Sequence, residues 1–397
     1  MINSPAFEKI RKEISKNYGD SLRQGGVSDK RRLPTGVFNI DYSIRGGLPI
    51  NRITILYGHK SCYKTYLALK AIKSYQSRCN FCFEIISQCE CGGKFEFGDK
   101  SNLLIISNPM IVVYIDTEHA LDEDHAARLG VDMENLQVFD PPYGEAACEY
   151  AEKFSQVPEV GLIIVDSLAG LVPEKELESG YFDKVAQSLR ARLIARMYRA
   201  LITHLRRGTG YPPRLAVAIN HLLPNRDGYG DILPGGETQK YLSSVALRTQ
   251  VTRKQYINVT KKGEDEIEEE NDESEESKRS KRKFIEEEET KIRKQPVKFV
   301  VEHSKVSPDL IRGEFEVFLG EEDGVKFGDT NDFRVVYNRA EKLGLLENDG
   351  NLVENYKTMR NIWIKDELVY ERIKKMVIES AVQNIKEFAH DKTKVLS

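Results

Sequence analysis

One short segment has the residue types of a loop that binds phosphate groups, and it runs Gly58-His59-Lys60-Ser61-Cys62-Tyr63-Lys64-Thr65. It lies between an apolar stretch that predicts a β-strand and one that predicts a helix, which is the context such a loop requires. Its backbone N–H groups would hold phosphate oxygens, Lys64 would neutralise the β and γ phosphates, and Thr65 would bind Mg²⁺. Tyr63 stands where a glycine normally precedes the lysine, so a loop that merely resembles the motif is the alternative.

Two acidic residues end apolar stretches that predict strands. Asp166 follows Leu162–Val165, an arrangement that puts a carboxylate beside the magnesium of a nucleotide. Glu118 comes shortly after Tyr114 and Ile115, where it could orient and deprotonate the water that attacks the γ-phosphate. Each acid could instead cap the next helix. Their occurrence together with the phosphate-loop motif favours a nucleotide hydrolase.

Four of the six cysteines lie close together in the sequence, at Cys79, Cys82, Cys89 and Cys91. Four thiolates can close a tetrahedral zinc site, and Gly92-Gly93 permit the tight turn that such knuckles use. We therefore predict structural Zn²⁺, with four reduced thiols in a loop as the alternative. A catalytic metal is not expected, because no nearby histidine or carboxylate completes a pattern with an open position. The clustering fits a reducing compartment better than a disulfide framework.

The elements that must position these residues alternate between strands and helices. Short, β-branched and almost continuously apolar stretches predict buried parallel strands at Ile53–Tyr57, Ile111–Ile115, Gly161–Val165 and Leu215–Ile219. Helical stretches such as 186–206 separate them, and further strands are expected at 297–301 and 314–319. The pattern predicts a doubly wound α/β domain whose ligand lies at the carboxyl ends of the strands.

Other segments attach to or interrupt this core. A helix beginning near Ser4-Pro5 precedes a polar linker that ends at about residue 32, and it could pack on its own domain or on a neighbouring subunit. An insertion at 79–107 holds the cysteines, and a second at 261–294 is so acidic and poor in apolar groups that we expect a disordered spacer, or a segment that competes with DNA for basic surface. Residues 346–397 predict a small helical subdomain. Its expected packing residues are Trp363, Leu368, Ile373, Val377 and Ile378.

Charge and hydropathy exclude some protein classes. The net charge is −3, with 30% of the residues charged, so any nucleic-acid site must come from local placement of basic groups. The first residues lack a secretory-signal pattern, and no run of about 18 apolar residues predicts a membrane span. We expect a cytoplasmic protein, in the host cytoplasm if the protein is viral, with no membrane partner.

Several motifs together resemble the RecA family in order and approximate spacing. They are the phosphate loop, Leu33–Gly36, Gly46–Pro49, Ile115–Asp122, Ile164–Ser167 and Ala218–His221. The resemblance implies a RecA-like P-loop NTPase core at 33–345 with a parallel-rich central sheet, and a polymerisation helix within 1–32. Tyr63 before the lysine, and His221 where bacterial RecA has glutamine, are similar to the UvsX type of recombinase from tailed bacteriophages.

The resemblance also implies roles in catalysis and in adenine binding. Glu118 would be the catalytic base, and His221 would sense the γ-phosphate, although a lone histidine is more often structural. Asp122 would contact adenine, and His125 falls where the family stacks a tyrosine on the base. Lys305 matches the position from which a neighbouring subunit reaches the γ-phosphate, or it is a solvated lysine at a strand end.

His303 is a second candidate for that contact between subunits. Two loops, 174–184 and 222–240, resemble the DNA-binding loops of the family. Their basic, aromatic and glycine residues suit sequence-independent contacts with phosphates and bases. The candidates are Tyr181, Phe182, Lys184, Arg226, Tyr229, Gly235 and Gly236.

The implied function is that of an ATP-dependent DNA recombinase. It would form a filament on single-stranded DNA with ATP and Mg²⁺, pair that strand with homologous duplex DNA, exchange strands and hydrolyse ATP. Loading and single-strand-binding proteins are expected partners. A non-catalytic mediator that binds ATP and DNA is the alternative function. A hexameric helicase is a weaker one, because the N-terminal helix suits an open filament better than a closed ring.

Overall fold

The computed structural model describes most of the chain between residues 31 and 395. The described residues are 8–10, 12–13, 16, 31–91, 94–97, 104–107, 110–178, 186–205, 212–225, 228–251, 294–319, 326–330, 332–348, 351–352 and 355–395. Most of the expected N-terminal helix lies outside them, as does the acidic insertion apart from Lys294. The proposed DNA-contacting residues Tyr181, Phe182, Lys184 and Arg226 also lie outside.

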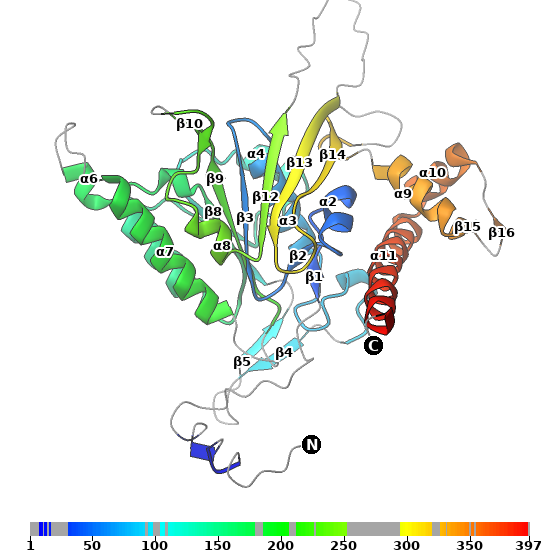
Figure 1. The fold of residues 1–397 in the computed structure, drawn as a ribbon, viewed down its shortest axis with the longest axis horizontal. Helices are drawn as coiled ribbons and strands as arrows, with labels where there is room; N and C mark the ends of the chain where they lie inside the picture. The colour runs from blue at the N-terminus through cyan, green and yellow to red at the C-terminus, as the bar shows by residue number, and fades with distance from the viewer. Residues whose placement is uncertain are drawn as a thin grey trace, which may run out of the picture.

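An eight-stranded sheet forms the centre of the molecule, in the order β14-β13-β12-β3-β9-β8-β6-β7 (Figure 1). Its strands are β3 (Ile53–Gly58), β6 (Ile111–Asp116), β7 (Leu136–Phe139), β8 (Val160–Asp166), β9 (Leu215–His221), β12 (Val245–Val251), β13 (Lys294–Ser304) and β14 (Ile311–Phe318). Neighbours from β12 to β7 pair in parallel, whereas β13 and β14 are antiparallel additions at one edge. The mostly parallel α/β core predicted from the sequence is therefore confirmed.

Helices cover both faces of this sheet, because side chains along each buried strand alternate between two apolar clusters. On β6, Val112 and Tyr114 belong to one cluster, whereas Val113 and Ile115 belong to the other. The first cluster includes residues of α2 (Phe38–Ser43), α3 (Lys64–Gln76) and α4 (Glu123–Arg128). The second includes residues of α5 (Gly144–Phe154) and α7 (Ala186–Leu205), which lies along one side of the molecule in Figure 1.

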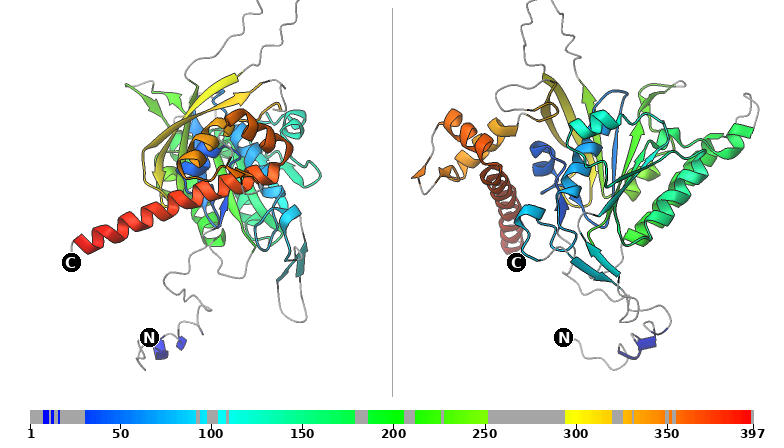
Figure 2. Two further views of the ribbon diagram at one scale, coloured as in Figure 1. Left: turned by 90° about the vertical axis from the view of Figure 1, so that its right-hand side faces the viewer. Right: turned by 180° about the vertical axis from the view of Figure 1, so that it is seen from behind.

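The C-terminal helices form a third apolar cluster beside α2 (Figure 2). They are α9 (Asp332–Lys342), α10 (Tyr356–Lys365) and α11 (Glu367–Val395). Trp363 is buried at the centre, and its ring stacks on Phe333 with centroids 6.1 Å apart. Helix α9, which precedes residue 346, also belongs to this cluster. Leu368 does not pack as expected, because it is 52% exposed on the outer side of α11.

Short elements complete the described fold. The two-residue strands are β1 (Arg32–Leu33), β2 (Leu48–Pro49), β10 (Leu223–Pro224), β11 (Asp231–Ile232), β15 (Glu347–Asn348) and β16 (Asn351–Leu352). The others are η1 (Ile86–Gln88), β4 (Lys94–Phe97), β5 (Leu104–Ser107), η2 (Leu168–Gly170), α6 (Glu174–Glu178) and α8 (Thr238–Leu242). Among the described helices, none combines the length and the apolar character needed to cross a membrane.

The contact between Gly161 of β8 and Tyr75 of α3 gives a test of this packing. A Cβ atom at Gly161 would lie 1.8 Å from the Tyr75 hydroxyl oxygen, and that hydroxyl donates to the Pro213 carbonyl at 2.5 Å. We expect Gly161→Ala to lower the free energy of unfolding, measured by urea denaturation, by about 1–3 kcal/mol. Adding Tyr75→Leu should make the double variant less costly than the sum of the single ones. Stability within about 0.5 kcal/mol of the parental protein would contradict this packing.

Candidate functional site

The predicted site residues converge because they follow the carboxyl ends of adjacent parallel strands. Strands β3, β9, β8 and β6 are successive neighbours in the sheet. In their register Gly58 lies opposite His221, and Asp116 lies opposite Asp166. The phosphate-loop motif and both candidate acids therefore share one edge of the sheet, which is where ligands bind in open α/β folds.

The segment from Gly58 to Thr65 has the tight backbone of a phosphate-binding loop. Gly58 approaches the carbonyl oxygen of Thr249 so closely that a Cβ atom there would lie 2.3 Å from it. Tyr63 has a φ of 65°, in the left-handed region, which explains why a glycine is usual at this position. Lys64 begins α3, is buried, and donates from Nζ to the His59 carbonyl oxygen at 2.6 Å. Burial lowers the pKa of Lys64.

Oxygen ligands suited to Mg²⁺ meet beside this loop. The Thr65 hydroxyl donates to Oδ2 of Asp166 at 2.8 Å, and the Tyr114 hydroxyl donates to the same oxygen at 2.7 Å. Asp166 is buried, and this burial raises its pKa, whereas the two hydrogen bonds act in the opposite direction. A cation bound here would stabilise the ionised carboxylate, and a hydroxyl with a carboxylate is a donor set that magnesium accepts.

The structure brings Glu118 into direct contact with His221. Oε1 of Glu118 lies 2.8 Å from Nε2 of His221, and the same oxygen accepts a hydrogen bond from the Ser167 hydroxyl. The hydrogen bond from His221 is the main reason that the pKa of Glu118 falls to about 2, and burial opposes it. Asp116 shapes the turn that presents Glu118 by accepting from the backbone N–H groups of Glu118 and Ala120, at 3.1 and 2.9 Å.

The residue before His221 connects this pair to the loop after β9. Nδ2 of Asn220 donates to Oε1 of Gln239 at 2.7 Å and to the Pro234 carbonyl at 2.9 Å. Gln239 in turn donates to the Pro234 and Gly236 carbonyls, each at 2.7 Å. Asn220 and Gln239 are both fully buried. Gln239 was not a predicted site residue, because nothing in its sequence surroundings marks a buried amide.

A second contact joins the phosphate loop to the same region. Nε2 of His59 lies 3.0 Å from Oδ2 of Asp231 on β11, and Arg248 of β12 reaches the same carboxylate oxygen at 3.5 Å. The β10–β11 hairpin that carries Asp231 is part of the loop expected to meet DNA. The edge of the sheet with the phosphate loop and this second loop are therefore connected at two points within the chain.

A cavity of about 260 Å³ opens beside the phosphate loop. Its lining residues are mostly aromatic or apolar: Ser61, Tyr63, Tyr66, His125, Leu129, Val317, Leu319, Phe327 and Gly328. The His125 and Phe327 rings meet edge to face with centroids 5.5 Å apart. Asp122 is absent from this lining, because its side chain caps α4 by accepting from the His125 N–H at 2.8 Å. An aromatic cavity next to a phosphate site suits a planar base.

Phe327, Tyr63 of the phosphate loop and Tyr66 of α3 were not predicted as base-binding residues. Phe327 is far from the loop in sequence, and only the pairing of β13 with β14 brings its segment there.

The basic candidates for a contact between subunits, Lys305 and His303, do not line this cavity. Nζ of Lys305 donates to the carbonyl oxygen of Tyr241, in the last turn of α8, at 2.9 Å, and His303 lies 3.4 Å from Asp309.

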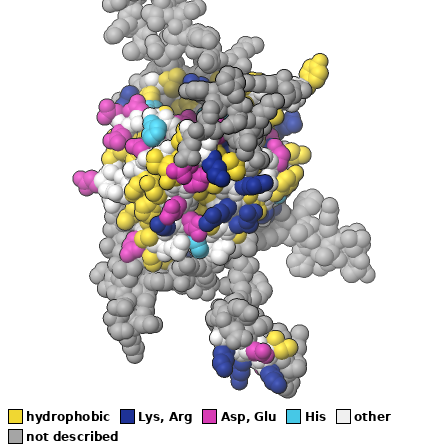
Figure 3. Space-filling model, turned by 90° about the vertical axis from the view of Figure 1, so that its left-hand side faces the viewer, with side chains coloured by type: hydrophobic (Ala, Val, Ile, Leu, Met, Phe, Trp, Pro, Cys, Tyr) yellow, Lys and Arg dark blue, Asp and Glu magenta, His cyan; other side chains and the backbone are white. Residues whose placement is uncertain are grey.

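Among the candidate DNA-contacting residues, the structure describes Tyr229, Gly235 and Gly236. Tyr229 is fully exposed, and both glycines have φ values near +80° in the turn that Gln239 holds. Helix α7 adds a row of exposed arginines at Arg192, Arg196 and Arg199. Figure 3 views the molecule from the side of α6 and α7 and shows Lys and Arg side chains grouped on this face.

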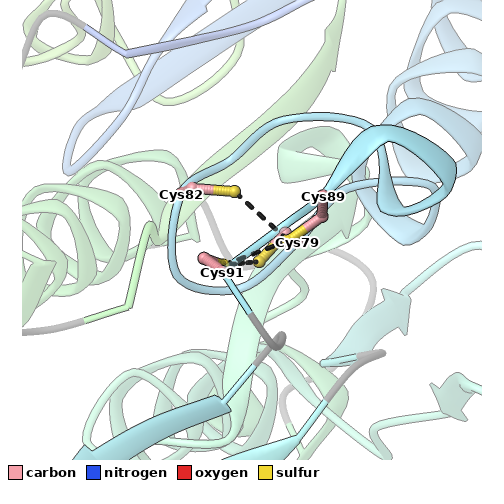
Figure 4. A group of neighbouring side chains, drawn as sticks. All are labelled: Cys79, Cys82, Cys89 and Cys91. Atoms are coloured by element: carbon pink, nitrogen blue, oxygen red, sulfur yellow. Dashed lines mark hydrogen bonds between the residues drawn. The ribbon is translucent and has the colours of Figure 1, made fainter.

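The four clustered cysteines lie together at the end of α3 that is remote from the phosphate loop (Figure 4). All four sulfur atoms are within 4.8 Å of one another, and none forms a disulfide. The structure thus assembles the predicted set of thiol ligands. Cys148 lies elsewhere, on α5, and Cys62 is buried within the phosphate loop.

Comparisons with known proteins match part of this chain to RecA proteins. Residues 89–273 match the sequence model of the RecA N-terminal domain, a range that includes Glu118, Asp166 and His221. The chain is 31% identical over 253 residues to protein RecA of Picosynechococcus sp., covering 62% of this chain and 64% of that protein. It is 32% identical over 247 residues to protein RecA of Aquifex pyrophilus, covering 61% of each. The chain thus spans less than two thirds of the length of these relatives.

Among solved structures, the crystal structure of the RadB recombinase aligns with 72% of this chain and 96% of its own. The TM-score is 0.41 and the identity is 15%, a likeness too low to bear on the fold or the function.

The depressed pKa of Glu118 makes a prediction about stability and pH. A carboxyl group whose pKa is lowered by folding stabilises the protein above its ordinary value of 4.5, and this stability is lost as the pH falls through about 2. We expect Glu118→Gln to lower the free energy of unfolding by about 1 kcal/mol near neutrality, after allowance for solvent screening, and by less in acid. Urea denaturation across a pH series measures the difference. Glu123→Gln, at an exposed position on α4, is the control. A difference that does not narrow in acid would contradict the Glu118–His221 contact.

Proposed function

We propose that this chain, whose core has the RecA-like α/β fold, is an ATP-dependent DNA recombinase of the cytoplasm. It would form a filament on single-stranded DNA, pair that strand with homologous duplex DNA, exchange strands and hydrolyse ATP to turn the filament over. Such a filament would depend on loading and single-strand-binding proteins. The aromatic Tyr63 and the histidine at position 221 favour the UvsX type of tailed bacteriophages within the family.

The observation that carries this proposal is the pair of neighbouring residues at the end of β9. His221 contacts Glu118 at the nucleotide edge, whereas Asn220 holds the buried Gln239 and, through it, the turn with Gly235 and Gly236. Because Asn220 and His221 are adjacent at the end of β9, a shift of His221 at the nucleotide edge would also shift Asn220. Movement of the turn held by Gln239 would act on His221 in the same way. An ATPase whose activity responds to a ligand in the following loop needs such a connection.

The residues have complementary roles in ATP hydrolysis. Lys64 and the backbone amides at the start of α3 would bind the phosphates, and Thr65 with Asp166 would hold the Mg²⁺ that accompanies ATP. Mg²⁺ supplies charge that offsets the phosphates. Glu118, ionised and held by His221 and Ser167, would orient the attacking water and accept its proton. A γ-phosphate near Glu118 would compete for His221, which suits the proposed sensing role.

The aromatic cavity would receive the adenine base. Four aromatic rings line it, those of Tyr63, Tyr66, His125 and Phe327, and the two tyrosine rings meet edge to face. Asp122 would act indirectly, by fixing the first turn of the helix that carries His125. Lys305 and His303 would complete the site across a subunit boundary. To do so, Lys305 would have to break its hydrogen bond with the end of α8 and form one with a phosphate.

DNA would lie along the two candidate DNA-binding loops, 174–184 and 222–240, and the arginine row of α7. The exposed Tyr229 offers a ring for base stacking, and Arg226, Lys184, Tyr181 and Phe182 would extend the same surface. Arg192, Arg196 and Arg199 are exposed at helical spacing, which suits contacts with successive phosphates. Binding dominated by phosphates should weaken steeply as salt concentration rises.

The strained tyrosine in the phosphate loop favours one second candidate function. Tyr63 occupies a left-handed backbone position that glycine adopts more easily, so hydrolysis could be slow or lost while binding persists. The protein would then be a mediator that binds ATP and DNA and regulates another recombinase. The contacts of Glu118, Asp166 and His221 are intact, and they favour a recombinase that hydrolyses ATP over this mediator.

The first test is ATP hydrolysis by the purified protein with and without single-stranded DNA, over a salt series. We expect hydrolysis that DNA stimulates and that salt suppresses, and Lys64→Ala should abolish it. A joint-molecule assay with homologous duplex DNA then tests strand exchange. Nucleotide and DNA binding without hydrolysis would instead support the mediator.

The assigned role of Glu118 has its own test. Glu118→Gln keeps the size and the hydrogen-bonding oxygen of the side chain but removes the base. We expect the maximal ATPase rate to fall by roughly 10²–10⁴-fold, while ATP and DNA affinities stay within about threefold of the parental values. Glu123→Gln on α4 should leave all three quantities unchanged. Parental hydrolysis by Glu118→Gln would exclude Glu118 as the base.

A further inference from the structure

The four-cysteine cluster has the geometry of a metal site that the proposed function does not use. Sulfur separations are 3.3 Å for Cys79–Cys91, 3.5 Å for Cys82–Cys89 and 3.0 Å for Cys89–Cys91. Four sulfurs bound to one zinc ion at about 2.3 Å would be about 3.8 Å apart. The observed spacing is slightly tighter and much longer than a disulfide bond. We propose that these residues bind one structural Zn²⁺ ion, which closes the segment from 77 to 91 into a knuckle.

The backbone around the first two cysteines supports this assignment. The N–H of Ile86 donates to the Ser77 carbonyl, and that of Cys79 to the Glu84 carbonyl, each at 2.8 Å. The chain therefore turns back on itself and presents two sulfurs to the same point (Figure 4). The Phe81 N–H donates to the Cys79 sulfur at 3.3 Å, a contact that stabilises negative charge on a thiolate.

Three cationic side chains contact the knuckle. Four thiolates and one Zn²⁺ ion carry a net charge of about −2, and nearby positive charge would stabilise such a centre. Arg31 donates to the Phe81 carbonyl at 3.1 Å, and Arg78 donates to the Phe83 carbonyl at 2.9 Å. Lys375 of α11 lies 3.2 Å from Glu84. Arg31 and Arg78 thus place positive charge against the backbone of the knuckle, whereas the charge of Lys375 is paired with Glu84.

The position of the cluster indicates a structural metal. Helix α3 has 13 residues, so its far end lies about 20 Å from the phosphate loop. The group that could hold a metal here contains only the four cysteines, which would fill a tetrahedral coordination shell and leave no position for a substrate.

The knuckle also needs a source of stability other than apolar burial. Phe83 is its main anchor, packing on Tyr75 of α3 with ring centroids 5.9 Å apart. Phe81 is 50% exposed and Ile86 is 39% exposed, so they contribute little buried surface. A metal that crosslinks four positions would supply the missing constraint, as in other small zinc modules. It would fix the bases from which β4 and β5 extend.

Metal analysis of the full chain, purified without chelator, tests the proposal directly. We expect about one equivalent of zinc, and Co²⁺ substitution should give the absorption bands of a tetrahedral thiolate site. Chelation should lower the melting temperature and increase hydrogen exchange in residues 77–91. Less than about half an equivalent of zinc, iron in its place, or intact disulfides by mass spectrometry would overturn the assignment.

A pair of matched variants tests which cysteines are responsible. Cys89→Ser should lose most of the zinc, whereas Cys148→Ser should retain it, because Cys148 lies on α5 outside the cluster. Zinc retained by Cys89→Ser would contradict the proposal. If Cys89→Ser does not fold, chelation of the parental protein provides the same comparison. These readouts do not involve ATP or DNA, so their outcome is independent of the proposed recombinase activity.

Discussion

The register of β3 against β9 is the constraint on which the rest of the site depends. Because the strands are parallel and Gly58 lies opposite His221, the phosphate loop and the loop after β9 begin at the same level of the sheet. The pairing of Asp116 with Asp166 sets a second level next to it. A slip of one residue between β6 and β8 would turn one of these acids toward the opposite face of the sheet, because side chains alternate along a strand. The geometry of the candidate site is thus a property of the whole sheet.

The sequence predicted those features that follow from local patterns. The strands that carry the site are continuous apolar stretches, and each was located to within about two residues. The polar residues just beyond them could be predicted to meet, because parallel strands share an edge. The four cysteines could be predicted to cluster for a similar reason, since they lie within 13 positions of each other (Cys79 to Cys91).

Other features depend on distant packing and could not be found in this way. Gln239 has no local signal, yet it is fully buried and holds the turn after β9. Phe327 reaches the cavity beside the phosphate loop only through the strands that precede it, and Asp122 has a local capping role that its motif does not reveal. Leu368 was expected to be buried from its apolar character, but it lies on the outer face of α11. A helix with one exposed leucine is ordinary, because folded proteins expose much apolar surface.

The hairpin pairing of β12 with β13 has a consequence for how this chain can vary. Val251 lies opposite Val297, so the ladder holds the two ends of the intervening segment side by side. The entropy of closing a flexible connection grows only with the logarithm of its length, at about 0.6 kcal/mol per doubling. Residues can therefore be gained or lost between these strands at little cost to the fold. This connection is a position where related chains can differ greatly in length and charge while the α/β core stays the same.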